Sequence, residues 1–221
     1  MHVNHHKISV TKTAHYSTHG QLTKTTKYIW IACHGYGQLA SRMIERFDFL
    51  DTEDHFVIAA EGLNRFYWHK NNKPVSAWMT SQDRYDEIND FVAYLDTLYS
   101  KYCQHVNQAE VKIVLFGFSQ GCATLWRWIH ARQPRFDYLI NWAGWIPEDI
   151  SFVHLLEYLN ASQMHLHYGN EDHFITDETV SKITDVIKAN HLDVTVSQFD
   201  GKHVIPKEEL ISFVSSNILV D

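Results

Sequence analysis

The clearest candidate for a catalytic residue is a serine that lies between two glycines. Residues 117–121 read GFSQG, which matches the pattern G-x-S-x-G, and they lie between the apolar run 111–116 and a helical pattern in 121–132. A strand, a sharp turn and a helix in this order form a nucleophile elbow, which exposes a serine hydroxyl at the end of a sheet. The elbow needs glycine on both sides, because the turn is strained and neighbouring backbone passes too close for a β-carbon. The pattern therefore predicts that Ser119 is a nucleophile.

A serine hydroxyl is a weak nucleophile and needs a base beside it. After a nucleophile elbow, the acid and then the histidine of a triad follow at the ends of later strands. Asp172 follows the predicted strand 164–168, and His203 follows the predicted strand 194–199. We expect Asp172 to orient the imidazole of His203, which takes the proton of Ser119. Asp177 is the alternative acid, although its position favours an early helix residue.

An acyl-transfer site also needs N–H donors for the oxyanion. One is expected from Gln120, the residue after the nucleophile, at the start of a helix whose N-terminus stabilises negative charge. The second is expected from Tyr36, in the segment HGYG that directly follows the predicted strand 28–32 and Cys33. The imidazole of His34 in the same segment is predicted to be a structural hydrogen-bonding group rather than a catalyst.

Strand and helix patterns alternate along the chain, and the strands and helices that they predict must position these residues. Alternating strands and helices predict an α/β fold, with a mostly parallel sheet and helices on both faces. The length of 221 residues favours one domain spanning residues 1–221. The expected strands are 8–13, 28–32, 56–60, 111–116, 138–142, 164–168 and 194–199, and the expected helices are 87–102, 121–132, 177–189 and 207–219.

The segment 61–83 interrupts this alternation. It shows neither the strand nor the helix period, and its length is unusual for a connection in a compact domain. Its aromatic residues argue against disorder. Two interpretations stay open: an insertion that packs on the body, or a wall of the binding cleft. Trp78 in this segment and Trp145 after the strand 138–142 are the candidates for substrate-binding walls, and core packing is the alternative for both.

Together these motifs resemble the carboxylesterase/phospholipase family of α/β-hydrolases, which includes the acyl-protein thioesterases. The resemblance rests on GFSQG at 117–121, HG at 34–35, GNED at 169–172 and GKH at 201–203, with AGWIP at 143–147 and SAWM at 76–79 as further matches. It covers roughly residues 28 to 219. It implies an α/β-hydrolase fold and a serine esterase that cleaves carboxylic esters or thioesters through an acyl-enzyme, without a cofactor.

The chain departs from this family pattern in its loops. Residues 36–39 read YGQL where the family has a more glycine-rich stretch, and Lys202 lies between Gly201 and the histidine. The insertion at 65–79 is unlike the thioesterases and favours a bacterial esterase branch. These differences concern the substrate rather than the chemistry, so lysophospholipase or acyl-protein thioesterase specificity stays an alternative.

Composition limits the cellular compartments and the classes of partner that we expect for this chain. The net charge of −7 argues against nucleic acid, and no apolar run approaches the roughly 20 residues of a membrane span. The first residues lack the apolar core of a signal peptide, and three scattered cysteines do not suggest a disulfide framework. We therefore expect a cytoplasmic protein, a monomer or homodimer, that acts on a small ester or lipid-like molecule.

Three other functions compete with this hypothesis. The chain has 16 histidines, so a metal enzyme is one alternative, with His2, His5 and His6 near the start and with His165 and His167 on one strand face. No H-E-x-x-H pattern accompanies them, and no metal site is predicted. A second alternative is a binding protein with this fold but no activity. A third keeps the triad for a peptidase or a dienelactone-type hydrolase, although the latter favours cysteine at position 119.

Overall fold

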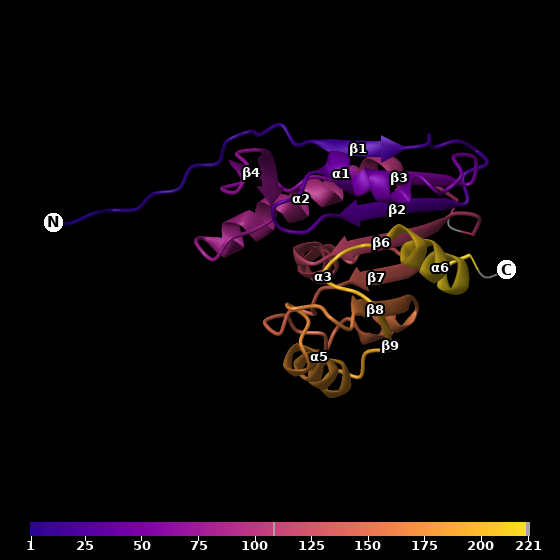
Figure 1. Cartoon of the computed structure of the whole chain (residues 1–221). Coiled ribbons are helices and arrows are strands. Elements are labelled where there is room, and N and C mark those ends of the chain that lie inside the picture. Colours follow the sequence, from indigo (N-terminus) through magenta and orange to yellow (C-terminus); the bar gives the residue numbers. More distant parts are fainter. Residues whose placement is uncertain (108, 220–221) are drawn as a thin grey trace.

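A mostly parallel sheet carries the residues that the motifs identified. The computed structural model describes residues 1–107 and 109–219, and the sheet has the strand order β1-β3-β2-β6-β7-β8-β9 (Figure 1). Only the pairing of β1 with β3 is antiparallel within this sheet. The predicted fold class is therefore confirmed. The strands are β1 (Tyr16–His19), β2 (Tyr28–Cys33), β3 (His55–Ala60), β6 (Lys112–Phe118), β7 (Tyr138–Trp142), β8 (Gln163–Gly169) and β9 (Val194–Phe199).

Both faces of this sheet are buried, which explains why its central strands are apolar at nearly every position. In β2, Ile29 and Ile31 belong to one hydrophobic core, whereas Trp30 and Ala32 belong to the other. Successive side chains of a strand point to opposite faces, so the alternation between cores follows from strand geometry.

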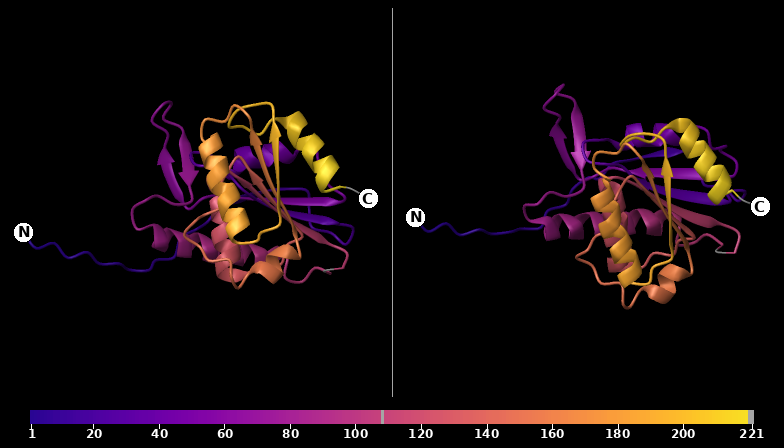
Figure 2. Two further views of the ribbon diagram at one scale, coloured as in Figure 1. Left: turned by 90° about the horizontal axis from the view of Figure 1, so that it is seen from below. Right: turned by 60° about the horizontal axis from the view of Figure 1, so that its bottom comes forward.

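Helices cover the two faces in two groups (Figure 2). Residues of α2, α3 and α5 pack in the core that contains Ile29, and residues of α1, the adjoining 3₁₀ helix η1 and α6 pack in the core that contains Trp30. The bounds are α1 (Ala40–Met43), η1 (Ile44–Phe47), α2 (Arg84–Tyr102), α3 (Gln120–Arg132), α4 (Leu156–Asn160), α5 (Asp177–Ala189) and α6 (Lys207–Asn217).

The chain changes direction across the sheet at β2. From β2 it continues to β3 on one side, and β6 then pairs with the other edge of β2. Ligands of open α/β sheets bind outside the carboxyl ends of the strands at such a switch point. The turns after β2 and β6, which hold Tyr36 and Ser119, both lie at this place.

Two sequence expectations are corrected here. Residues 8–13 form no strand, because Ile8 and Val10 stay exposed and bury no apolar surface that would offset the entropy of ordering the segment; β1 pairs with β3 instead. The first residues instead extend away from the body (Figure 1). The segment 61–83 contains an antiparallel hairpin of β4 (Asn64–Tyr67) and β5 (Pro74–Ala77), whose short strands the periodicity did not reveal.

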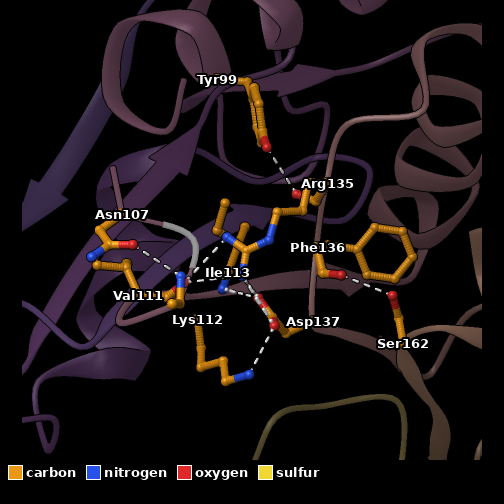
Figure 3. A network of polar contacts seen from close by, with 10 residues as sticks. Tyr99, Asn107, Val111, Lys112, Ile113, Arg135, Phe136, Asp137 and Ser162 are labelled. Carbon is orange, nitrogen blue, oxygen red and sulfur yellow. Dashed lines mark hydrogen bonds and ion pairs between the residues drawn. The ribbon is translucent and has the colours of Figure 1, made fainter. Parts of the chain in front are cut away.

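A polar network fixes the strands at the end opposite to the Ser119 turn (Figure 3). The Asp137 carboxylate accepts a hydrogen bond from the Ile113 N–H at 2.8 Å and pairs with Arg135 at 2.9 Å. Arg135 also donates to the Val111 carbonyl, and Lys112 lies 3.2 Å from Asp137. These contacts set the starts of β6 and β7 relative to each other, and so the relative heights at which both strands end.

Candidate active site

The turn that carries Ser119 has the geometry of a nucleophile elbow. Ser119 has φ 53° and ψ −117°, a strained conformation for a residue with a side chain. A β-carbon on Gly121 would lie 2.0 Å from the Cys33 carbonyl oxygen, and one on Gly117 would lie 2.7 Å from backbone atoms of Cys122. The two glycines are therefore required by close backbone approach, as the motif predicted.

Hydrogen bonds connect the three predicted triad residues. His203 Nε2 lies 2.9 Å from Ser119 Oγ, and His203 Nδ1 lies 2.7 Å from Asp172 Oδ2. A carboxylate can only accept, so Nδ1 carries a proton, and in the neutral ring Nε2 is free to accept the serine proton. Asp177 is not part of this chain of contacts: it is the first residue of α5, next to the N-cap Thr176.

Burial differs between the acid and the base. The Asp172 side chain is fully buried, and its second oxygen accepts from the N–H groups of Phe174 and Ile175 at 2.8 and 3.2 Å. These bonds hold the carboxylate in place for His203, whose side chain keeps 21% of its surface exposed. The rings of Phe118 and Phe174 flank the imidazole at 5.0 and 4.7 Å. Sequence reasoning missed Phe174, although its position two residues after Asp172 was a usable signal.

The segment after β2 lies directly against Ser119. A β-carbon on Gly35 would be 3.1 Å from the Ser119 β-carbon, and the Gly35 N–H is held by Gln38 Oε1 at 3.0 Å. Within the described residues, the N–H groups of Tyr36 and Gln120 donate to no protein acceptor. In the described part of the chain, two backbone N–H groups next to residues that contact or adjoin Ser119 are therefore without a protein acceptor.

The side chain of Gln120 connects the elbow to the end of the hairpin. Its Oε1 accepts from the Trp78 N–H at 3.0 Å, and its Nε2 donates to the Met79 carbonyl at 2.8 Å. Trp78 is only 1% exposed and donates through its indole to the His34 carbonyl. The expectation that Trp78 forms a substrate wall does not fit this burial, whereas Trp145 is 40% exposed.

His34 joins the segment after β2 to both ends of the hairpin. Its Nδ1 lies 2.7 Å from the Gly35 carbonyl, and its Nε2 accepts from the Gly62 N–H and lies 3.0 Å from Ser76 Oγ. The Gly62 donor requires a lone pair on Nε2, so the proton resides on Nδ1. Burial lowers the pKa of His34 from 6.5 to about 4. These bonds agree with the structural role predicted for it.

The hairpin packs on this same segment. The Gly37 N–H donates to the Ser76 carbonyl at 2.9 Å, and the Tyr36 ring lies 5.3 Å from Phe66 and 6.0 Å from Trp68. A β-carbon on Gly37, whose φ is +74°, would lie 2.5 Å from the Trp68 ring. The segment 61–83 is therefore ordered and packs on the segment after β2, where its contacts restrain the Tyr36 backbone.

Sequence comparison identifies the family. The sequence profile described as "Serine hydrolase (FSH1)" matches residues 33–212, a range that includes Ser119, Asp172 and His203. The chain belongs to this serine hydrolase family. A comparison with curated protein sequences found no significant match.

Solved structures resemble this serine hydrolase over most of its length. Acyl-protein thioesterase 2 of Zea mays is 17% identical with a TM-score of 0.69, covering 93% of this chain and 99% of its own. The phospholipase/carboxylesterase of Dyadobacter fermentans is 17% identical with a TM-score of 0.64, covering 94% and 97%. The Bacillus cereus carboxylesterase is 11% identical with a TM-score of 0.64, covering 92% and 94%. At these identities the likeness establishes the α/β-hydrolase fold.

Two buried histidines of the serine hydrolase lie away from the triad. His167 contacts Ser197 Oγ at 2.7 Å and Glu209 at 2.9 Å, while neither ring nitrogen of His165 has a partner in the described part of the chain. Burial lowers the pKa of both imidazoles. In residues 1–107 and 109–219, no group of three or more His, Cys, Asp or Glu side chains is arranged for a metal ion, and no helix there has the length and apolarity to cross a membrane.

Proposed function

We propose that this serine hydrolase cleaves carboxylic esters and thioesters through a Ser-His-Asp triad and a covalent acyl-enzyme. The observation that carries this proposal is the continuous contact from Ser119 Oγ to His203 Nε2 and from His203 Nδ1 to the buried Asp172 carboxylate. The strained turn supports it further, because backbone strain of this kind is maintained where function uses it.

Acylation begins with attack by Ser119 Oγ on the carbonyl carbon while His203 Nε2 takes the hydroxyl proton. The carbonyl oxygen becomes negatively charged and accepts hydrogen bonds from the N–H groups of Tyr36 and Gln120. The bond from the carbonyl carbon to oxygen or sulfur then breaks, and His203 passes its proton to the leaving alcohol or thiol. Asp172 stabilises the imidazolium between these steps.

Deacylation repeats the sequence with water as the nucleophile. His203 takes a proton from water, the hydroxide attacks the acyl-enzyme, and the same two N–H groups stabilise the second oxyanion. Collapse releases the acid and returns the proton to Ser119. Loss of one oxyanion donor typically lowers the rate by about 10²–10³-fold.

Thioesters are included for a specific reason. The folds of an acyl-protein thioesterase and of two carboxylesterases match this chain over more than nine-tenths of its length.

Trp145 is the remaining sequence-based candidate for a substrate-binding wall, since this residue is accessible.

A fluorophosphonate probe tests the nucleophile directly. The wild-type protein should gain one covalent adduct on the peptide that contains Ser119 and should hydrolyse 4-nitrophenyl acetate. Ser119→Ala should lose both signals with an unchanged circular dichroism spectrum. Ser100→Ala, which alters an exposed serine on α2, is the matched control and should keep both. A folded wild-type protein that takes up no probe would contradict the proposal and favour a binding protein.

A further inference from the structure

A small cavity adjoins the triad on the side of His203. It has a volume of about 100 Å³, and its wall includes His203, Phe118 and Val204. Arg42 of α1 and Arg46 of η1 also line the cavity. Two arginines and the His203 side chain therefore line one cavity.

The charges around this cavity are not balanced. Arg42 pairs with Glu45 at 3.1 Å, but both side chains are more than half exposed, so this pair holds little energy. Arg46 forms no ion pair within the residues that the structure describes, and its Nη1 donates to the Ile205 carbonyl at 3.4 Å. The next acidic residue, Asp48, is paired with Lys207 at 2.7 Å. Arg46 thus has no carboxylate partner among residues 1–107 and 109–219.

The position of the cavity decides which half of a substrate it would meet. In the triad mechanism, His203 gives its proton to the leaving atom, so the leaving group must depart beside the imidazole. A cavity that shares His203 as a wall lies next to that path. Its small volume suits a short polar group better than a long alkyl chain.

We propose that Arg46, assisted by Arg42, binds an anionic substituent on the leaving alcohol or thiol. This inference rests on the proposed esterase function and specifies its substrate class: esters or thioesters whose leaving group carries a carboxylate or a phosphate a few bonds from the scissile atom. Guanidinium groups suit both anions, because their N–H donors match the two oxygens in a fork geometry. The anion takes no part in bond breaking.

Two matched thioesters test the proposal. The anionic substrate is 3-(acetylthio)propanoate, and the neutral one is the corresponding primary amide, 3-(acetylthio)propanamide, so the acyl group and the thiol carbon chain are the same and the neutral substrate has no second ester bond. Thiol release is followed with a chromogenic disulfide, and each kcat/KM is corrected for the hydroxide-catalysed rate. The wild-type ratio of anionic to neutral kcat/KM should be about 10 or more at low salt, and it should fall as salt screens the charges.

Variants then assign this preference to a residue. Arg46→Gln should lower the ratio about tenfold, Arg46→Lys should keep part of it, and the control Arg132→Gln, at the far end of α3, should keep the wild-type ratio. A wild-type ratio at or below about 1, or a ratio unchanged in folded Arg46→Gln, would overturn the subsite. If Arg46→Gln does not fold, Arg46→Lys and the salt dependence decide the matter. Failure of the wild-type protein to hydrolyse either thioester would instead contradict the proposed function.

Discussion

Lowering the pH from about 7.5 to about 5 should destabilise this serine hydrolase through His34. The imidazole is completely buried and joins the segment after β2 to Gly62 and Ser76. A proton on Nε2 would abolish its bond from the Gly62 N–H and would place a charge in the core. Because burial lowers the pKa of His34 to about 4 from 6.5, the unfolded chain binds the proton more readily. Acidification therefore favours unfolding.

The size of the effect follows from these two pKa values. The loss begins as the pH falls below 6.5 and stops growing below about 4, where the folded protein is protonated as well. Proton linkage gives a loss of about 2 kcal/mol at a pH of about 5 and about 3 kcal/mol at a pH of about 4. These values concern His34 alone, since other groups also titrate in this range.

Urea unfolding at the two pH values measures this contribution as a difference between proteins. The wild type should lose about 2 kcal/mol more than His34→Gln between the higher and the lower pH, whatever the stability of the variant at high pH. His154→Gln, which removes an exposed histidine, should behave as the wild type does. Equal losses in wild type and His34→Gln, or an NMR titration midpoint for His34 near that of a free imidazole, would refute the reasoning.

Three further predictions concern the site. Asp172→Asn should lower kcat for 4-nitrophenyl acetate about 10⁴-fold with the fold intact, because an amide can donate to Nδ1 and favour the wrong tautomer of His203; a loss below tenfold would argue against Asp172 as the orienting acid. Gly121→Ala should cost about 1–3 kcal/mol or more in thermal unfolding, because its β-carbon would lie 2.0 Å from the Cys33 carbonyl oxygen; unchanged stability would contradict the close approach. Gln120→Ala should cost about 1 kcal/mol for each of its two hydrogen bonds to residues 78 and 79 and should also reduce kcat. Reduced stability at constant kcat would show that this contact does not position the Gln120 N–H.

Local pattern was sufficient for the elbow and for the order of the triad residues. Glycine is needed on both sides of Ser119 because backbone atoms approach closely within this one turn. The pentapeptide, with a strand before it and a helix after it, is enough to recognise such a turn. Asp172 and His203 could be chosen because each follows a predicted strand, and parallel strands end at the same edge of a sheet. The strand predicted at 8–13 was wrong because a strand also needs a core that covers its apolar side chains, and no local pattern records whether one is in reach.

Other features of the site depend on contacts between segments that are distant in the sequence. Trp78 had the composition of a binding wall, yet its burial depends on packing against His34 and Phe91, which lie on other elements. Arg46 reaches the loop after His203 across 159 positions of sequence, and its bond to the Ile205 carbonyl has no counterpart in either segment alone. The sequence by itself determined the serine hydrolase family and was sufficient to propose a nucleophile, a base and an acid, because these are chosen by residue type and chain order. Only the tertiary structure decided what surrounds these residues. A cavity, an unpaired charge and a buried ring each depend on segments that are far apart in the sequence and that folding brings together.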